Sequence, residues 1–339
     1  MLNTLPALTL IATGGLAILL VGGTWTINGA VNLARHLGVS PLMIGMTIIA
    51  FGTSTPELVV SIQALWKEAP DIVIGNVLGS NVANILLIVG IAAAIKTLVI
   101  PNGAQIRRDY KLLLVFTVIF VLVLCCFQKI PGPLGILMLL VLLGYIVWSF
   151  RSSRNEERPH GVRLQLNEES GEKDLSLGAA VFFTLIGILG IVVGAYVLLE
   201  GSVGLARRLG ISEVVIGLTV IAVGTSLPEL AASIMAAIRG HPGLAIGNIM
   251  GSNLFNMFGI TGVAAAVSGF FVGPLQVPRQ VIHFDLWVML ASTLLICVIL
   301  LRSRRIVRWG GLGMVIIYVL YITAVFNQTA LAIAGCISR

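Results

Sequence analysis

Long apolar segments separated by short polar ones run along the whole chain. A hydrocarbon layer about 30 Å thick is crossed by roughly 20 apolar residues of α-helix. The alternation of polar and apolar residues that is typical of barrel strands is absent from these segments. The pattern therefore predicts an all-α polytopic membrane protein with ten transmembrane helices. The ten segments, defined to within a few residues, are 5–33, 43–66, 72–95, 111–128, 132–150, 177–205, 214–238, 243–268, 284–301 and 310–335.

The composition supports this class of protein. Of the 339 residues, 58% are hydrophobic and 10% are charged, whereas a soluble domain carries about 25% charged residues. The net charge is +7, but the basic residues form short clusters between apolar segments, which is typical of membrane topology rather than nucleic-acid binding. The four cysteines form no CxxC or Cys/His cluster, so we expect no zinc site and no disulfide framework. We expect no enzymatic activity, no cofactor and no nucleic-acid partner, and the sequence indicates no protein partner.

The positions of the basic residues predict an orientation in the bilayer. The first segment has no charged residues ahead of it, so we interpret it as a retained span rather than a cleaved signal. Ten spans place both termini on one side. Fifteen of the 21 Lys and Arg residues then lie on the side of the polar loop 151–176, and six lie on the other. Because positive charge stays in the cytoplasm, we expect a multi-pass cell (inner) membrane protein with a cytoplasmic loop and both termini outside.

The chain repeats itself with a shift of 172 residues. An alignment of residues 21–90 with 193–262 needs no gap and contains 34 identities in 70 positions. The most similar motifs are GMTIIAFGTSTPEL and GLTVIAVGTSLPEL, followed by IGNVLGSNVAN and IGNIMGSNLFN. They define a first motif region, 45–84, and a second, 217–256.

The repeat divides the chain into residues 1–150, the linker 151–176 and residues 177–339. Each half has five predicted spans, an odd number, so two similar halves in tandem cross the bilayer in opposite senses. The sequence thus predicts two inverted five-helix repeats. In secondary transporters with this arrangement, the substrate site lies between the halves, near the middle of the bilayer.

Two carboxylates lie deep in apolar segments, Glu57 and Glu229, at the same position of each repeat. A charge at the bilayer centre costs about 2.5–3.5 kcal/mol on insertion scales, and such residues usually face a cavity or a partner. No Lys or Arg lies in the central part of any predicted span. The two charges must therefore be balanced by protons or by bound cations, unless each Glu is protonated and only holds helices together.

Proline precedes each of these glutamates, as Pro56 and Pro228. Proline lacks an amide donor and frees the carbonyl four residues earlier, which predicts broken helices at the Pro-Glu motifs. A free carbonyl inside a bilayer needs a partner or a water-lined cavity. The breaks would thus add oxygen ligands beside the carboxylates, together with the hydroxyls of Thr53 and Thr225.

The next span of each half adds a polar helical face. We expect Ser80, Asn84, Ser252 and Asn256 to be cation ligands. For Asn76, Asn81, Asn248 and Asn253, the sequence leaves open whether they are ligands or make hydrogen bonds between helices. Calcium takes six to eight oxygens, two carboxylates neutralise its charge, and the same oxygens can bind Na⁺ in smaller groups. The absence of His and Cys from these segments disfavours zinc and copper.

The motifs GTSTPE with GNVLGSNVAN, repeated as GTSLPE with GNIMGSNLFN, resemble the two alpha-repeats of the calcium/cation antiporter superfamily, sodium/calcium exchanger type. The resemblance implies an antiporter in which Na⁺ entry drives Ca²⁺ export by alternating access. It implies that Glu57 and Glu229 are shared central ligands, with Asn84 and Asn256 beside them. By the same match, the sodium sites are lined by Thr53, Ser54, Ser80, Thr225, Ser226 and Ser252, with backbone carbonyls from Ala50 and Ala222.

Some members of that superfamily, including the branch that cotransports potassium, have Asp where this chain has Asn256. Both central positions are Asn here, so we expect an exchanger that does not depend on K⁺. The main alternative is a Ca²⁺/H⁺ antiporter that uses the same two glutamates as proton carriers. A passive channel, a structural or sensory membrane protein and an intramembrane enzyme are further alternatives. The enzyme would need a catalytic partner, and no His accompanies Ser54 or Ser226.

Overall fold

The computed structural model describes residues 4–67, 69–100, 104–155, 174–209, 224–271 and 273–337, and these are mainly helical. Within them, eight helices are long and apolar enough to cross a membrane, and one bent pair of helices forms a further candidate span. The protein is therefore a membrane protein with several apolar helices, as predicted. The seventh predicted segment, 214–238, lies partly outside the described residues, so the count of ten stays a prediction.

The helices before the linker comprise one long helix, then several short ones, and then two long ones. They are α1 (Leu5–Leu37), α2 (Pro41–Ile44), η1 (Gly45–Ile49), α3 (Ala50–Thr53), α4 (Thr55–Trp66), α5 (Asp71–Val82), η2 (Ala83–Val89), α6 (Gly90–Ile95), α7 (Ala104–Cys126) and α8 (Gly132–Asn155). The η elements are π-helical. Several helices extend beyond the predicted segments, because polar ends continue a helix after its apolar part has left the hydrocarbon. The largest such difference is at α7, which begins seven residues before the predicted start at residue 111.

The helices after the linker follow a similar order. They are α10 (Leu177–Arg208), α13 (Leu227–Ile238), α14 (Pro242–Leu254), η4 (Phe255–Ile260), α15 (Thr261–Phe271), α16 (Arg279–His283), α17 (Asp285–Arg302) and α18 (Arg308–Ile337). Four two-residue strands connect helix ends in the described part of the chain. Strand β1 (Leu98–Val99) pairs antiparallel with β4 (Arg305–Ile306), and β2 (Lys129–Ile130) pairs antiparallel with β3 (Leu275–Gln276). Each pair joins a segment before the linker to one after it.

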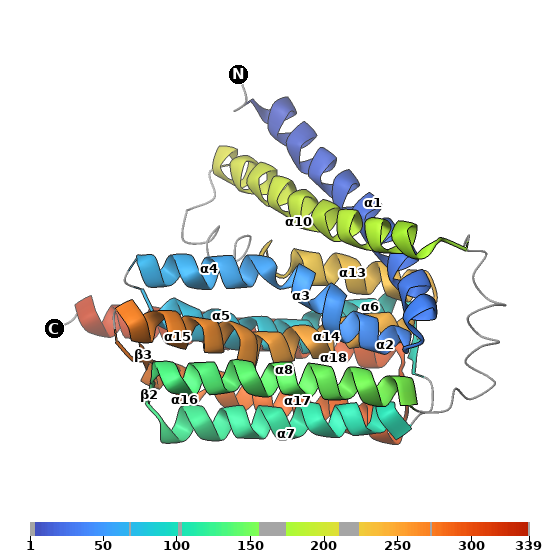
Figure 1. Cartoon of the computed structure of the whole chain (residues 1–339). Helices are drawn as coiled ribbons and strands as arrows, with labels where there is room; N and C mark the ends of the chain where they lie inside the picture. Colours follow the sequence, from blue (N-terminus) through green and yellow to red (C-terminus); the bar gives the residue numbers. More distant parts are fainter. Residues whose placement is uncertain are drawn as a thin grey trace.

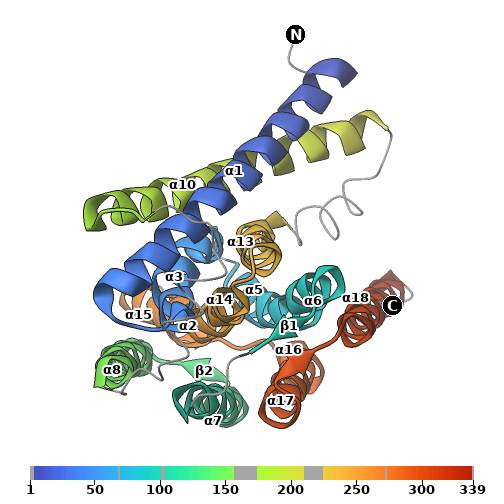
Figure 2. The same cartoon turned by 90° about the vertical axis from the view of Figure 1, so that its right-hand side faces the viewer.

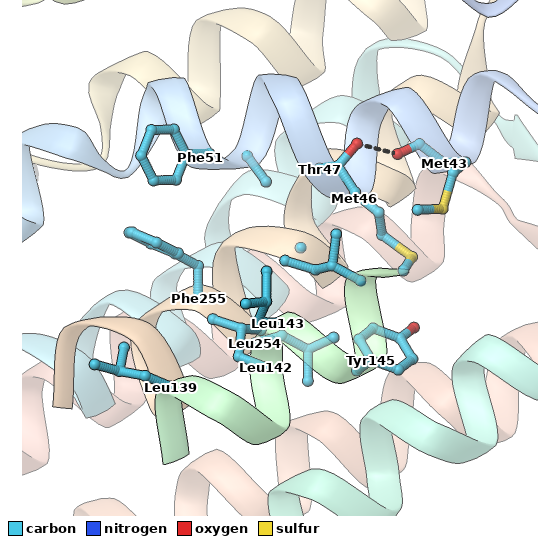
Figure 3. A pocket seen from close by; sticks show the side chains of 13 residues that line it. Met43, Met46, Thr47, Phe51, Leu139, Leu142, Leu143, Tyr145, Leu254 and Phe255 are labelled. Atoms are coloured by element: carbon cyan, nitrogen blue, oxygen red, sulfur yellow. Dashed lines mark hydrogen bonds between the residues drawn. The ribbon is translucent and has the colours of Figure 1, made fainter. Parts of the chain in front are cut away.

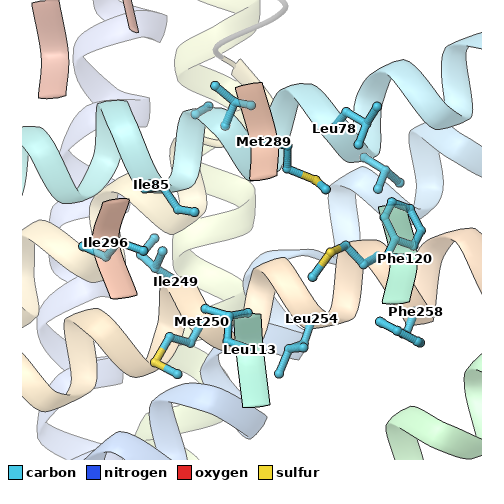
Figure 4. Packing of buried hydrophobic residues seen from close by; sticks show 14 of the residues in the cluster. Leu78, Ile85, Leu113, Phe120, Ile249, Met250, Leu254, Phe258, Met289 and Ile296 are labelled. Carbon is cyan, nitrogen blue, oxygen red and sulfur yellow. The ribbon is translucent and has the colours of Figure 1, made fainter. Parts of the chain in front are cut away.

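Helices α1 and α10 form a layer of their own, which crosses the rest of the molecule at one side (Figure 1). Helices α3, α4, α5, α6, α13 and α14 lie in the middle, α18 lies beside α6, and α7, α8 and α17 lie on the side opposite α1 and α10 (Figure 2). The hydrophobic core fills the space between α5, η2, α14, η4, α7 and α17, with Leu78, Ile249, Phe120 and Met289 among its residues (Figure 4).

Glycine allows α1 and α10 to pack closely. A Cβ atom at Gly22 would lie 2.6 Å from the backbone nitrogen of Ile191 and 2.8 Å from the carbonyl oxygen of Gly187. Only glycine fits at such a distance, because the neighbouring atoms are backbone and cannot rotate away. The repeat-related Gly194 is equally close to the backbone of Leu19, so the crossing depends on backbone contact from both helices.

Candidate cation-binding site

The structure breaks the first motif helix at the predicted place, and in the second half α13 begins at Leu227, directly after Ser226; most of the segment before this motif lies outside the described residues. Helix α3 ends at Thr53 and α4 begins at Thr55, with a bend of 41° between the two segments. Ser54 stands at the break with φ −85° and ψ 7°, and Ser226 has nearly the same conformation, φ −89° and ψ 7°, ahead of α13. Each proline then lies in the first turn of the new helix, where its missing amide costs no hydrogen bond.

The breaks place Glu57 and Glu229 in the first turns of α4 and α13, where a helix N-terminus favours negative charge. The side chains are 1% and 0% exposed, respectively. Each carboxylate accepts a hydrogen bond from the serine at the other break. The distances are 2.7 Å from Ser54 Oγ to Glu229 Oε1 and 3.5 Å from Ser226 Oγ to Glu57 Oε1. The two predicted central ligands therefore belong to one site, which both halves of the chain form.

Other predicted ligands lie around the carboxylates. Ser252 Oγ donates to Glu229 Oε1 at 3.5 Å. Thr53 Oγ1 is 3.4 Å from the carbonyl oxygen of Ala50 and 3.2 Å from Asn248 Oδ1. Ser80 is also buried, whereas Thr225 is half-buried. The predicted carbonyl ligand Ala222 lies outside the described residues.

Asn76 and Asn248 make the helix–helix hydrogen bonds that the sequence left as one of two possibilities. Asn76 Nδ2 donates to the carbonyl oxygen of Glu57 at 3.2 Å and to Ser61 Oγ at 3.1 Å. Asn248 Nδ2 makes the same two contacts in the second half, to the carbonyl oxygen of Glu229 at 3.4 Å and to Ser233 Oγ at 3.1 Å. The two serines were missed by the sequence interpretation, although both are identical in the repeat alignment. Each asparagine thus fixes the turn that carries a glutamate.

Four asparagines connect the two halves beside the carboxylates. Asn84 Nδ2 donates to Asn253 Oδ1 at 3.0 Å, and Asn256 Nδ2 donates to Asn81 Oδ1 at 3.1 Å. All four side chains are 1% exposed. Asn84 and Asn256 lie in the π-helical segments η2 and η4, and single π-helical turns occur frequently at functional sites.

Four oxygens of the site have no hydrogen-bond partner among the described residues. They are Glu57 Oε2, Glu229 Oε2, Asn84 Oδ1 and Asn256 Oδ1. Ion pairs within the described part of the chain include Arg35–Asp174 and Arg108–Asp109, and none that is seen there involves Glu57 or Glu229. Because a buried polar atom without a partner is costly, these oxygens are suited to a cation.

A separate cavity of about 190 Å³ lies between η1, α8 and α14, and is lined mainly by aliphatic and aromatic side chains (Figure 3). Of the two hydroxyl-bearing side chains in its lining, Thr47 and Tyr145, Thr47 already donates its Oγ1 hydrogen to the carbonyl oxygen of Met43 at 2.7 Å. An apolar lining cannot replace the hydration shell of a metal ion. The cavity is therefore not the cation site, although Ala50 and Gly251 border it.

Comparison with known proteins identifies the family. The model of the sodium/calcium exchanger protein family matches the chain twice, over residues 7–151 and 179–327. The chain belongs to this exchanger family. The resemblance found in the two motifs is thereby confirmed, and the family is one of transporters rather than of enzymes.

Relatives are similar over most of the chain. The sodium/calcium exchanger MaX1 of Methanosarcina acetivorans is 32% identical over 92% of this chain and 96% of its own. The inner membrane protein YrbG of Escherichia coli is 34% identical over 78% of this chain and 82% of its own. Among solved structures, the sodium-calcium exchanger NCX_Mj soaked with 10 mM Na⁺ and zero Ca²⁺ superposes with a TM-score of 0.80. The match has 28% identity and covers 94% of this chain and 99% of that one.

Proposed function

We propose that the protein is a secondary antiporter that exchanges Na⁺ for Ca²⁺ across the membrane by alternating access, independently of K⁺. The observation that carries this proposal is the group of four buried oxygens without partners, two from carboxylates and two from amides. Oxygen ligands of this kind are those that Ca²⁺ prefers. The name of the relative MaX1 supports the same pair of ions.

The charge of the site suits one Ca²⁺ or a small number of Na⁺ ions. Glu57 and Glu229 supply two negative charges, which one Ca²⁺ neutralises. The hydroxyls of Thr53, Ser54, Ser80, Thr225, Ser226 and Ser252 and the carbonyls of Ala50 and Ala222 complete the set of oxygens that we assign to Ca²⁺ and Na⁺. Two ions that compete for the same carboxylates cannot both occupy the site, and this competition is the basis of exchange.

Independence from K⁺ follows from the amides of Asn84 and Asn256. An amide oxygen attracts a cation without adding a negative charge, so the site carries the charge of two carboxylates rather than three. A K⁺ ion bound together with Ca²⁺ would then leave one uncompensated positive charge in the middle of the protein, where it is costly.

We further propose that residues 1–150 and 177–339 form inverted five-helix repeats, joined by a cytoplasmic linker 151–176 with both termini outside. The equivalent contacts of Asn76 and Asn248, 172 residues apart, support the repeat. A reporter that is active only in the cytoplasm, fused at Arg339, tests the orientation. Activity of that fusion would contradict it.

Uptake of ⁴⁵Ca into proteoliposomes tests the function. Vesicles that contain the purified protein are preloaded with Na⁺, K⁺ or choline at fixed pH, and uptake is started by dilution into medium without Na⁺. We expect uptake from Na⁺-loaded vesicles only, with no increase when K⁺ is added. Uptake driven by a pH gradient without Na⁺ would instead establish the Ca²⁺/H⁺ antiporter, and flux without any counter-ion would establish a channel.

A further inference from the structure

Asn81 and Asn253 are buried polar residues to which the proposed transport cycle assigns no task. They are related by the repeat, are 1% exposed, and lie one helical turn or less from the amide ligands. Neither side chain has an orphaned oxygen of the kind seen at Glu57 and Glu229. Their contacts therefore have to be explained by something other than direct cation binding.

The contacts of the two residues run between the halves. The Oδ1 atom of Asn253 accepts from Asn84 Nδ2 at 3.0 Å, and the Oδ1 atom of Asn81 accepts from Asn256 Nδ2 at 3.1 Å. In both pairs, the side-chain oxygen of Asn81 or Asn253 accepts a hydrogen bond from the amide nitrogen of an asparagine in the other half. The amide oxygens of Asn84 and Asn256 are left without partners on the opposite side of each amide group.

The two holding residues are themselves fixed. Asn81 Nδ2 donates to the backbone carbonyl of Asn253 at 3.4 Å and lies 3.5 Å from Met289 Sδ. Asn253 Nδ2 lies 3.5 Å from the backbone carbonyl of Asn81. Because their nitrogens are engaged with backbone carbonyls, their oxygens are the atoms turned towards the two ligand amides.

We propose that Asn81 and Asn253 are positioning residues that set the amide orientation of Asn256 and Asn84, so that oxygen rather than nitrogen faces the cation. An asparagine amide has an acceptor end and a donor end of nearly the same shape. A flipped Asn84 would point two N–H donors at the cation and bring its oxygen against Asn253 Oδ1. Both contacts are repulsive, so the crossed pairs select the orientation that binds a cation.

This inference rests on the proposed function, because it concerns the same cation site. The inference predicts which positioning residue acts on which ligand amide. Asn253 should act only through Asn84, and Asn81 should act only through Asn256. A merely structural role in packing the two halves would not distinguish between the two ligand amides.

A double-mutant cycle on ⁴⁵Ca binding by the purified full-length protein tests the pairing. Asn253→Ala is compared in the wild type, in Asn84→Ala and in Asn256→Ala, and Asn81→Ala is compared in the same three backgrounds. The loss of one neutral hydrogen bond predicts an increase of about 2- to 10-fold in the Kd for Ca²⁺ for each single positioning variant. We expect Asn253→Ala to have no further effect in Asn84→Ala but its full effect in Asn256→Ala, and Asn81→Ala to show the reverse.

Two results would overturn the inference. One is an equal effect of Asn253→Ala in both ligand backgrounds, and the other is an unchanged Kd in both single positioning variants. Thermal unfolding of each variant in detergent shows which proteins are folded, and the Asn81 cycle provides the test if Asn253→Ala does not fold. Flux assays on the wild type distinguish the two proposals. If the wild type shows no Na⁺-driven Ca²⁺ uptake, the proposed function is wrong, whereas the pairing is tested by the Ca²⁺-binding cycle alone.

Discussion

Replacement of Glu229 by glutamine removes one charge from the site and changes little else. The side chain is fully buried, and its Oε1 accepts hydrogen bonds from Ser54 at 2.7 Å and Ser252 at 3.5 Å. Glutamine has nearly the same volume and keeps an oxygen that can accept both bonds. A change in ion binding by Glu229→Gln therefore reports mainly on the charge of the carboxylate.

The magnitude follows from the burial of the charge. Removal of one partner of a buried ion pair costs about 3–5 kcal/mol, and each 1.4 kcal/mol is about tenfold in affinity. We expect the Kd for Ca²⁺ to rise by about 10²- to 10³-fold, at the lower end of this range because Glu57 still contributes its charge. Coulomb energy is proportional to the charge of the ion, so binding of Na⁺ should weaken less than binding of Ca²⁺.

The assay is Ca²⁺ uptake by Na⁺-loaded proteoliposomes, together with thermal unfolding in detergent with and without Ca²⁺. A ligand that binds only the folded protein raises its stability by mass action, so Ca²⁺ should stabilise the wild type and not Glu229→Gln at the same concentration. Glu200→Gln is the matched control, because Glu200 is exposed on α10. Retention of wild-type uptake and Ca²⁺ stabilisation by Glu229→Gln, or equal losses in both variants, would refute the assignment of the charge to ion binding.

Two further predictions concern packing and stability, both measured by thermal unfolding in detergent. Gly22→Ala should destabilise the protein by about 1–3 kcal/mol, because its Cβ would meet backbone atoms of α10. Gly14→Ala should be neutral or slightly stabilising, since no atom of the described residues lies within 4 Å of a Cβ there; equal effects would contradict the close-packing argument. Tyr321→Phe should cost about 1–3 kcal/mol, because it removes the 2.8 Å hydrogen bond from Tyr321 Oη to the half-buried Asp285. Tyr196→Phe, at an exposed position, should have no effect, and a similar shift in both tyrosine variants would show that this hydrogen bond is not responsible.

The parts of the site that depend on local chemistry could be predicted from the sequence. Pro56 ahead of Glu57 predicts a broken helix because proline cannot donate a backbone hydrogen bond, and the chain breaks at Ser54. Burial of the two carboxylates follows from the apolar residues around them and the absence of nearby basic side chains. Because the Pro-Glu motif occurs once in each half, the same reasoning applies to Glu57 and to Glu229, and both are buried.

The parts that depend on packing between distant segments could not be predicted. The sequence gives no reason why Ser54 should bond to Glu229 rather than to Glu57, which is three residues away along its own chain. The π-helical segments around Asn84 and Asn256 have no distinctive composition. Nor does the repeat alignment, which fades after residue 95, reveal that β1 would pair with β4.

The direction of the hydrogen bonds explains how two similar halves make one site. The backbone of each glutamate turn is tied to the next helix of its own half, through Asn76 or Asn248. The carboxylate of that turn accepts a hydrogen bond from a serine of the opposite half, and the amides of Asn84 and Asn256, which we propose as ligands, are held in the same crossed manner. Neither half therefore contains a complete set of the proposed cation ligands in the orientation that the site requires. A relative movement of the halves must change the bonds at both carboxylates together, which provides a physical link between ion occupancy and the conformation of the whole protein.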